Sequence, residues 1–172
     1  MHLFLTGEIQ VGKSTIINKA VQSLGRPVGG FRTVAGNYAP DGSSDIFIIS
    51  TGDKMNCCND SNRVAHRTGV PGKGFTTFPQ VFDTVGASLL RRAGEYPLII
   101  MDELGFMESR ALEFQKAVFE RLDEDVPVLG VVKPMKTDFL DRIRAHEKVN
   151  ILSVDVFNRE DVLKGILDRM PY

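Results

Sequence analysis

A short segment with two glycines near the amino end constrains this chain more than any other stretch. It reads GEIQVGKST over residues 7–15 and matches the pattern G-x-x-x-x-G-K-[ST]. It follows an apolar run at residues 3–5 and leads into residues 13–24, where apolar side chains recur at helical spacing. A strand, a thin turn and a helix in this order predict a loop whose backbone N–H groups, at a helix N-terminus, bind phosphate.

The side chains of this loop indicate how phosphate is bound. Lys13 is expected to reach the outer phosphates, and the Ser14 hydroxyl is expected to take one position on a magnesium ion. The candidate nucleotide-binding residues of the loop are Gly7, Glu8, Ile9, Gln10, Val11, Gly12, Lys13, Ser14 and Thr15. The alternative interpretation is a strand–turn–helix junction that binds nothing.

Length and charge limit the fold and the class of partner. The chain has 172 residues, enough to bury most of its apolar surface in one core, so we expect a single domain over residues 1–172. Its 21 basic and 22 acidic residues are interspersed, which gives no support for a nucleic-acid partner. The start, MHLFLTGE, lacks a signal-peptide pattern, and no stretch has the length of a membrane span. We therefore expect a soluble cytoplasmic protein.

The rest of the chain alternates between strand and helix patterns. Residues 28–50 predict an antiparallel hairpin that turns at residues 40–43, and residues 51–78 predict short strands and loops. Further strands are expected at residues 98–101, 126–132 and 149–154, and further helices at residues 79–93, 108–122, 137–145 and 158–170. This order predicts an α/β three-layer sandwich of the P-loop type, with a mostly parallel sheet and an antiparallel hairpin inserted after the first helix.

A second chemical motif follows the apolar run at residues 98–101, where the chain continues with Asp102 and Glu103. Carboxylates at the carboxyl end of a buried parallel strand lie where open α/β sheets bind ligands. We expect Asp102 to hold magnesium through water, opposite Ser14, and Glu103 to orient or deprotonate an attacking water. The alternative is a solvated strand end or a helix cap.

Four segments, taken together, resemble a known family. They are HLFLTG with GKST at the amino end, GFRT at residues 30–33, IIMDELGFME at residues 99–108 and FNRED at residues 157–161. Over nearly its whole length the chain is similar to the small P-loop nucleoside-triphosphatases of thermophiles and vertebrates. The resemblance implies slow, magnesium-dependent hydrolysis of ATP, GTP or another nucleoside triphosphate to the diphosphate and phosphate, with loose base preference.

The same resemblance assigns site residues. The family's phosphate loop corresponds to residues 6–14, which adds Thr6 to the site, and its strand motif corresponds to Asp102 and Glu103. Its closing Asn-Arg pair corresponds to Asn158 and Arg159, which follow the last expected strand. A contact with the base or ribose and a purely structural role in helix capping and surface pairing both stay open for that pair.

This chain departs from the family pattern in four places. Ile9 and Gln10 stand where the family has proline and glycine, Ala35 replaces a glutamate, and Phe106 replaces a lysine after DE-x-G. A lysine beside the catalytic glutamate can stabilise charge in the transition state, so its loss puts the rate in doubt. The arginines considered as substitutes are Arg32, Arg63, Arg67 and Arg110.

Two other functions could use the same loop and magnesium. Phosphoryl transfer to a small acceptor needs an arginine-rich lid, and the side chains considered for it in residues 51–78 are Arg63, Arg67 and Lys73. A nucleotide-dependent binding module, with an unknown protein partner reading its ligand state, would fit weakened chemistry at Phe106. Phosphate release with and without acceptors separates the first two functions, and bound but intact nucleotide indicates the third.

Overall fold

The computed structural model describes residues 1–52, 57–70 and 74–170. Its strands are β1 (His2–Thr6), β2 (Gly29–Ala35), β3 (Ser44–Ser50), β4 (Arg63–Arg67), β5 (Phe75–Thr77), β6 (Ile99–Leu104), β7 (Val128–Val132) and β8 (Val149–Ser153). Its helices are α1 (Lys13–Leu24), α2 (Pro79–Val81), α3 (Ala87–Ala93), α4 (Leu112–Asp123), α5 (Asp138–Arg144) and α6 (Arg159–Arg169), with a 3₁₀ turn, η2 (Asp60–Asn62), and a π-helical segment, η3 (Phe82–Gly86).

The described strands form one sheet in the order β5-β4-β3-β2-β6-β7-β1-β8. The strands from β2 through β6, β7 and β1 to β8 run parallel to one another. All residues of β7 are buried, as expected of a central strand covered on both faces. Because β7 lies between β6 and β1, the residues that follow these three strands converge at one edge of the sheet.

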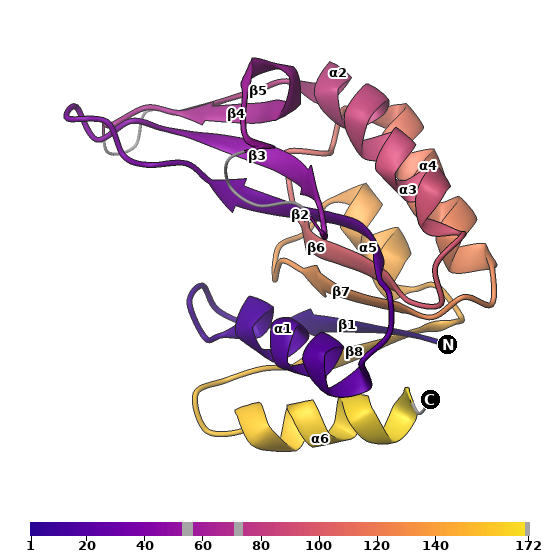
Figure 1. Ribbon diagram of the computed structural model, residues 1–172. Helices are drawn as coiled ribbons and strands as arrows, with labels where there is room; N and C mark the ends of the chain where they lie inside the picture. The colour runs from indigo at the N-terminus through magenta and orange to yellow at the C-terminus, as the bar shows by residue number, and fades with distance from the viewer. Residues whose placement is uncertain (53–56, 71–73, 171–172) are drawn as a thin grey trace.

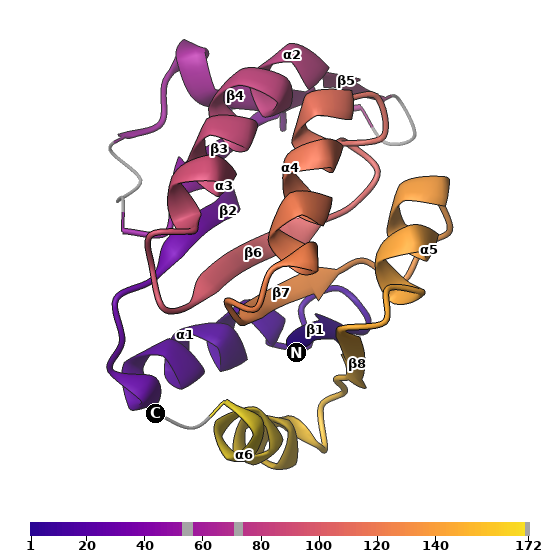
Figure 2. The ribbon, with the colours of Figure 1, turned by 90° about the vertical axis from the view of Figure 1, so that its right-hand side faces the viewer.

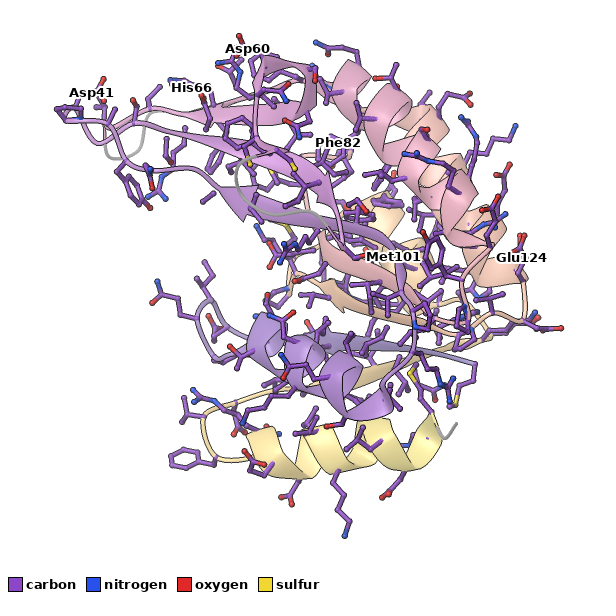
Figure 3. All side chains as sticks on the ribbon, in the orientation of Figure 1. Asp41, Asp60, His66, Phe82, Met101 and Glu124 are labelled. Atoms are coloured by element: carbon purple, nitrogen blue, oxygen red, sulfur yellow. The ribbon has the colours of Figure 1, made fainter. Side chains whose placement is uncertain are left out.

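The other half of the sheet is antiparallel and forms what we call the hairpin arm, β2 to β5 with their connections. The expected β2–β3 hairpin is confirmed, and β4 and β5 extend it in the antiparallel sense. The arm projects beyond the parallel strands on the side of the phosphate loop (Figure 1). Figure 3 labels Asp41 at its tip and His66 on β4, whose Nδ1 lies 2.8 Å from Asp45 Oδ1 on β3.

Helices cover both faces of the parallel strands. Helices α1 and α6 lie on one face, and α3, α4 and α5 lie on the other (Figures 1 and 2). On the second face Phe82 and Met101 belong to one apolar core, and both lie between the sheet and the helices in Figure 3. On the first face Ile16 of α1 and Ile166 of α6 belong to a separate core. The three-layer α/β arrangement predicted from the sequence is therefore confirmed.

Several element boundaries differ from the expectations. Strand β6 continues to Leu104, so Asp102 and Glu103 lie inside the strand, where its pairing with β7 shifts register between Met101 and Leu104. The helix expected from residue 108 begins at Leu112, because residues 105–111 make turns first. The helix expected at residues 79–93 contains the π-helical segment η3.

Part of the expected loop region, residues 53–56 and 71–73, lies outside the described residues, and so does Lys73, one of the side chains considered for a lid. No helix in the described ranges is long and apolar enough to cross a membrane.

Candidate active site

The loop between β1 and α1 turns at positions that favour glycine. Gly7 has φ 140° and Gly12 has φ 96°, values that side chains with a Cβ rarely adopt. A Cβ on Gly7 would lie 2.2 Å from Val154 O, so the loop packs directly on the segment after β8. Gln10, where the family has glycine, also has a positive φ of 65°. This residue therefore carries backbone strain of roughly 1–2 kcal/mol.

The Lys13 side chain folds back over this loop. Its Nζ donates hydrogen bonds to Gly7 O at 2.7 Å and to Glu8 O at 2.6 Å. Burial lowers the pKa of the Lys13 ammonium, and the negative charge of Glu103 works in the opposite direction. The ammonium is thus held over the loop at the position where the outer phosphates are expected.

Ser14 and Asp102 are in contact although they lie 88 residues apart in the sequence. Ser14 Oγ donates to Asp102 Oδ1 at 3.2 Å, which joins the first turn of α1 to β6. Asp102 is only 9% exposed. Burial raises the pKa of its carboxyl to about 6, with the Ser14 hydrogen bond lowering it and the charge of Glu103 raising it further.

The chemistry of this pair fits magnesium. A hydroxyl and a carboxylate are oxygen ligands, and Mg²⁺ in nucleotide sites commonly binds one or two protein groups together with substrate phosphates and water. Among the described residues, no group of three or more His, Cys, Asp or Glu side chains is arranged to hold a metal ion. The Ser14–Asp102 pair could supply two oxygen ligands to such an ion.

The Glu103 carboxylate forms an ion pair with Lys133, a residue that was not predicted to belong to the site. Glu103 Oε1 lies 2.9 Å from Lys133 Nζ, and both side chains are about three-tenths exposed, at 30% and 27%. Lys133 is the first residue after β7. The signal available in the sequence was a lysine directly after an apolar strand, analogous to the acids at the end of the apolar run in β6.

Lys13, Glu103 and Lys133 line one cavity of about 910 Å³, whereas Ser14 and Asp102 are not among its lining residues. Gly7 and Lys13 line it from the phosphate loop, Glu103 and Lys133 from the strand ends, and Arg67 from the hairpin arm. The volume lies within the range of small-molecule pockets, about 300–1,000 Å³. The cavity thus extends from the phosphate loop towards the hairpin arm.

Other loop residues take different positions. Glu8 and Ile9 also line the cavity, and the Ile9 side chain is 81% exposed. Val11 is buried in the core beneath α1. Thr6 lies at the end of β1, where its O accepts a hydrogen bond from Val154 N.

Asn158 and Arg159, the closing Asn-Arg pair, make different contacts. Asn158 Oδ1 accepts from Asp155 N and its Nδ2 donates to Ser153 O, both at 2.9 Å, so this side chain closes its own turn. A helix cap by the Asn158 side chain was one of the roles suggested by the sequence. Asn158 does precede α6, but its side chain makes no capping hydrogen bond. Arg159, in contrast, reaches the phosphate loop: a Cβ on Gly12 would lie 3.4 Å from Arg159 Nε. A smaller cavity of about 170 Å³ lies here, lined by Gly12, Thr15, Ile16, Lys19, Arg159, Glu160 and Leu163.

The four arginines considered as substitutes for the family lysine are dispersed. Arg67 lines the large cavity, and its Nη1 donates to Tyr38 Oη at 3.2 Å. Arg32 lies on β2 in register with Asp102. Arg63 is paired with Asp45 and Asp60, and Arg110 is exposed outside the cavity lining. Lys133 is the basic side chain in contact with Glu103.

Comparisons with known proteins identify the family of the chain. A family model described as NTPase matches residues 2–167. The chain is 32% identical to nucleoside-triphosphatase THEP1 of Thermococcus kodakarensis, over 99% of this chain and 94% of that one. It is 30% identical to the cancer-related nucleoside-triphosphatase homolog of Mus musculus, over 96% of this chain and 94% of that one.

A solved structure shows the same fold. The crystal structure of THEP1 from the hyperthermophile Aquifex aeolicus superposes with a TM-score of 0.78 over the full length of both chains, at 24% sequence identity. The fold and the two sequence comparisons point to the same group of proteins. The chain therefore belongs to the NTPase family, together with the THEP1 and cancer-related nucleoside-triphosphatases.

Proposed function

We propose that this chain hydrolyses nucleoside triphosphates, with Mg²⁺, to the nucleoside diphosphate and phosphate. The observation that carries the proposal is the contact of Ser14 with Asp102, with Glu103 facing the same cavity as Lys13. These groups supply, at one place, a hydroxyl and a carboxylate for a metal, a cation for phosphate and a carboxylate for water. The names of the THEP1 relatives, nucleoside-triphosphatases, support the same activity.

The roles of the residues follow from their positions. The glycine loop and the start of α1 bind the phosphates through backbone N–H groups, and Lys13 exchanges its carbonyl partners for phosphate oxygens. Glu103 accepts a hydrogen bond from a water and aligns it with the terminal phosphorus, and this kind of proton-accepting group contributes about 10²–10⁴-fold to a rate. Ser14 and Asp102 would hold Mg²⁺, which would supply positive charge against the outer phosphates.

Two features support loose base preference. Asn158, the residue considered for a base contact, uses its side-chain oxygen and nitrogen within its own turn. Arg159 lies against Gly12, where it suits a phosphate or ribose more than a base edge. We therefore propose that the chain recognises the triphosphate and magnesium, with few groups that distinguish one base from another.

Phosphoryl transfer to a small acceptor is the second candidate, and the size of the cavity favours it. The lining continues from Glu103 to Arg67 on the hairpin arm, so there is volume beyond the expected position of the terminal phosphate. A second phosphorylated molecule with its anionic group near Arg67 would be placed to receive the phosphoryl group.

The experiment measures phosphate release by the purified chain from ATP, GTP, CTP and UTP, with MgCl₂ or with EDTA. We expect release that requires magnesium, with the diphosphate as the other product and similar rates for the four bases. Nucleoside monophosphates are added in parallel, and formation of a new diphosphate from them would instead indicate a kinase. Nucleotide that binds and stays intact would indicate a binding module and contradict hydrolysis.

A further inference from the structure

We propose that Lys133 binds the terminal phosphate of the nucleoside triphosphate and supplies the positive charge that this active site needs beside Glu103. The inference rests on the proposed function, because it names a further residue for the same site.

The strand order places Lys133 between the two motifs. Strand β7 is the neighbour of both β6, which carries Asp102 and Glu103, and β1, which leads into the phosphate loop. Lys133 is the first residue beyond the carboxyl end of β7. A side chain leaving the sheet there lies between the water-orienting carboxylate on one side and the phosphate loop on the other.

The backbone of Lys133 is held from two directions. Its N–H donates to Leu104 O at 2.9 Å, which ties it to the end of β6. Its carbonyl accepts a hydrogen bond from Arg144 Nη2 of α5. The lysine therefore starts from a fixed point, as a group that acts on substrate requires, rather than from a freely moving loop.

The side chain of Lys133 runs across the turn after β6. A Cβ on Gly105 would lie 3.0 Å from Lys133 Cδ, so the aliphatic part of the lysine packs over that glycine. The ammonium then lies 2.9 Å from Glu103 Oε1 and 5.9 Å from the centre of the Phe106 ring. Lys133, Glu103 and Phe106 all line the large cavity.

Charge explains why this ammonium suits a phosphate. Lys13 and Lys133 both bring a positive charge to the lining of one cavity, and a triphosphate is a multiply charged anion that both can bind. A water aligned by Glu103 for attack lies next to the terminal phosphorus, and Lys133 Nζ is within one hydrogen-bond length of the same carboxylate. The ammonium can therefore contact a terminal phosphate oxygen while it keeps Glu103 as a partner.

The same arrangement accounts for Phe106. The family pattern has a lysine there, beside the glutamate, and this chain has an aromatic ring that packs edge-on against Phe75 of the hairpin arm, with ring centres 5.4 Å apart. Lys133 places its ammonium over that ring. Lys133 therefore places a positive charge beside both Glu103 and Phe106.

The test compares Lys133→Met and Lys133→Arg with wild type, and Lys136→Met serves as the matched control because Lys136 is an exposed lysine of the same connection. Calorimetry gives the affinity for a non-hydrolysable triphosphate analogue and for the diphosphate, both with Mg²⁺, and steady-state kinetics give kcat and KM. We expect Lys133→Met to weaken the triphosphate analogue by about tenfold or more, with little change for the diphosphate, since a hydrogen bond to a charged group contributes about 1.5–3 kcal/mol. Lys133→Arg should retain most of the preference, and Lys136→Met should behave as wild type.

A double variant tests whether an ammonium at position 106 can replace that of Lys133. Phe106→Lys in the Lys133→Met background should recover a substantial part of the triphosphate preference and of kcat, because it returns an ammonium to the same region. Circular dichroism and thermal unfolding establish that each variant is folded, and Lys133→Gln replaces Lys133→Met if the latter is not.

An unchanged ratio of triphosphate to diphosphate affinity in folded Lys133→Met overturns the inference, even if kcat falls, because a loss of kcat alone would mean that Lys133 only positions Glu103. If wild type binds triphosphate through Lys133 but releases no phosphate, the hydrolysis proposal fails while this inference stands. Wild type that binds no nucleotide overturns both.

Discussion

Ser14 Oγ donates a hydrogen bond of 3.2 Å to Asp102 Oδ1, so the first turn of α1 is joined to β6 across the intervening strand β7. The contact brings together the two segments that carry the groups proposed to hold Mg²⁺. The paired strands β6, β7 and β1 place these segments at one edge of the sheet, and the hydrogen bond ties the start of α1 to the strand that carries Glu103.

The first prediction concerns that link. Ser14→Ala removes the hydroxyl and should raise the Mg²⁺ concentration needed for half-maximal phosphate release by about tenfold, since it removes one ligand position and one hydrogen bond of about 1 kcal/mol. A magnesium titration at saturating nucleotide measures the shift. Ser14→Thr keeps the hydroxyl and is the control; an equal shift in both variants would contradict the assignment.

Lys13→Ala should abolish nucleotide binding. The ammonium now contacts Gly7 O and Glu8 O, and phosphate oxygens are expected to replace these partners, so its removal takes away charge-assisted contacts. We expect affinity to fall by about a hundredfold or more in calorimetry. Lys116→Ala, at an exposed position on α4, is the control, and a Lys13→Ala chain that binds like this control would refute the role.

Glu103→Gln should separate binding from chemistry. The amide keeps the shape of the side chain but is a poor proton acceptor, so nucleotide affinity should change little while turnover falls by about 10²–10⁴-fold. Single-turnover hydrolysis together with calorimetry gives both quantities. Glu113→Gln, at an exposed ion pair with Arg91, controls for the loss of one negative charge. Hydrolysis at the wild-type rate would remove Glu103 from the mechanism.

The sequence predicted the features that depend on local patterns. The phosphate loop is a contiguous motif with helical periodicity after it, and the acids of β6 follow an apolar run, so each could be located without knowledge of the sheet. The parallel part of the sheet followed from the alternation of strands and helices. These predictions share a feature: the residues that carry each one are close together in the chain.

The residues that were missed depend on the order of strands in the sheet. Lys133 meets Glu103 because β7 pairs with β6, and a lysine directly after an apolar strand does not by itself indicate which strand lies beside it. The position of Asn158 was correct as the residue before α6, but its side chain bonds Asp155 N and Ser153 O instead of capping the helix. Competing local partners of this kind are not encoded in spacing.

Backbone geometry gives the fourth prediction. Gly7→Ala should lower the free energy of unfolding by about 2–3 kcal/mol or more and should weaken nucleotide binding, because its Cβ would lie 2.2 Å from Val154 O, at φ 140°. Gly25→Ala is the matched control: it also has a positive φ, but nothing lies within 4 Å of its added Cβ. It should therefore lose only about 1 kcal/mol. Urea unfolding of both variants measures the difference, and equal losses would contradict the steric explanation.

The fifth prediction uses Glu108, a carboxyl that is fully buried beside the active site. Its Oε2 accepts a hydrogen bond from Gly105 N at 2.9 Å, while its Oε1 is buried without a partner among the described residues. Burial raises the pKa of Glu108 from 4.5 to about 7, and the positive charge of Lys133 opposes that rise. The folded chain thus keeps this proton over a pH range in which the unfolded chain has already released it.

The sign of the effect on stability follows from that difference. Between pH 4.5 and about 7 the unfolded state binds fewer protons than the folded state, so the Glu108 contribution to the free energy of unfolding is present below this window and is lost as the pH rises through it. The loss amounts to at most about 3 kcal/mol. Glu108→Gln stays neutral and lacks this dependence. Urea unfolding at pH 5 and pH 8 should therefore show the variant gaining up to about 3 kcal/mol relative to wild type at the higher pH. Parallel pH curves for wild type and Glu108→Gln would mean that Glu108 is ionised in the folded protein at neutral pH.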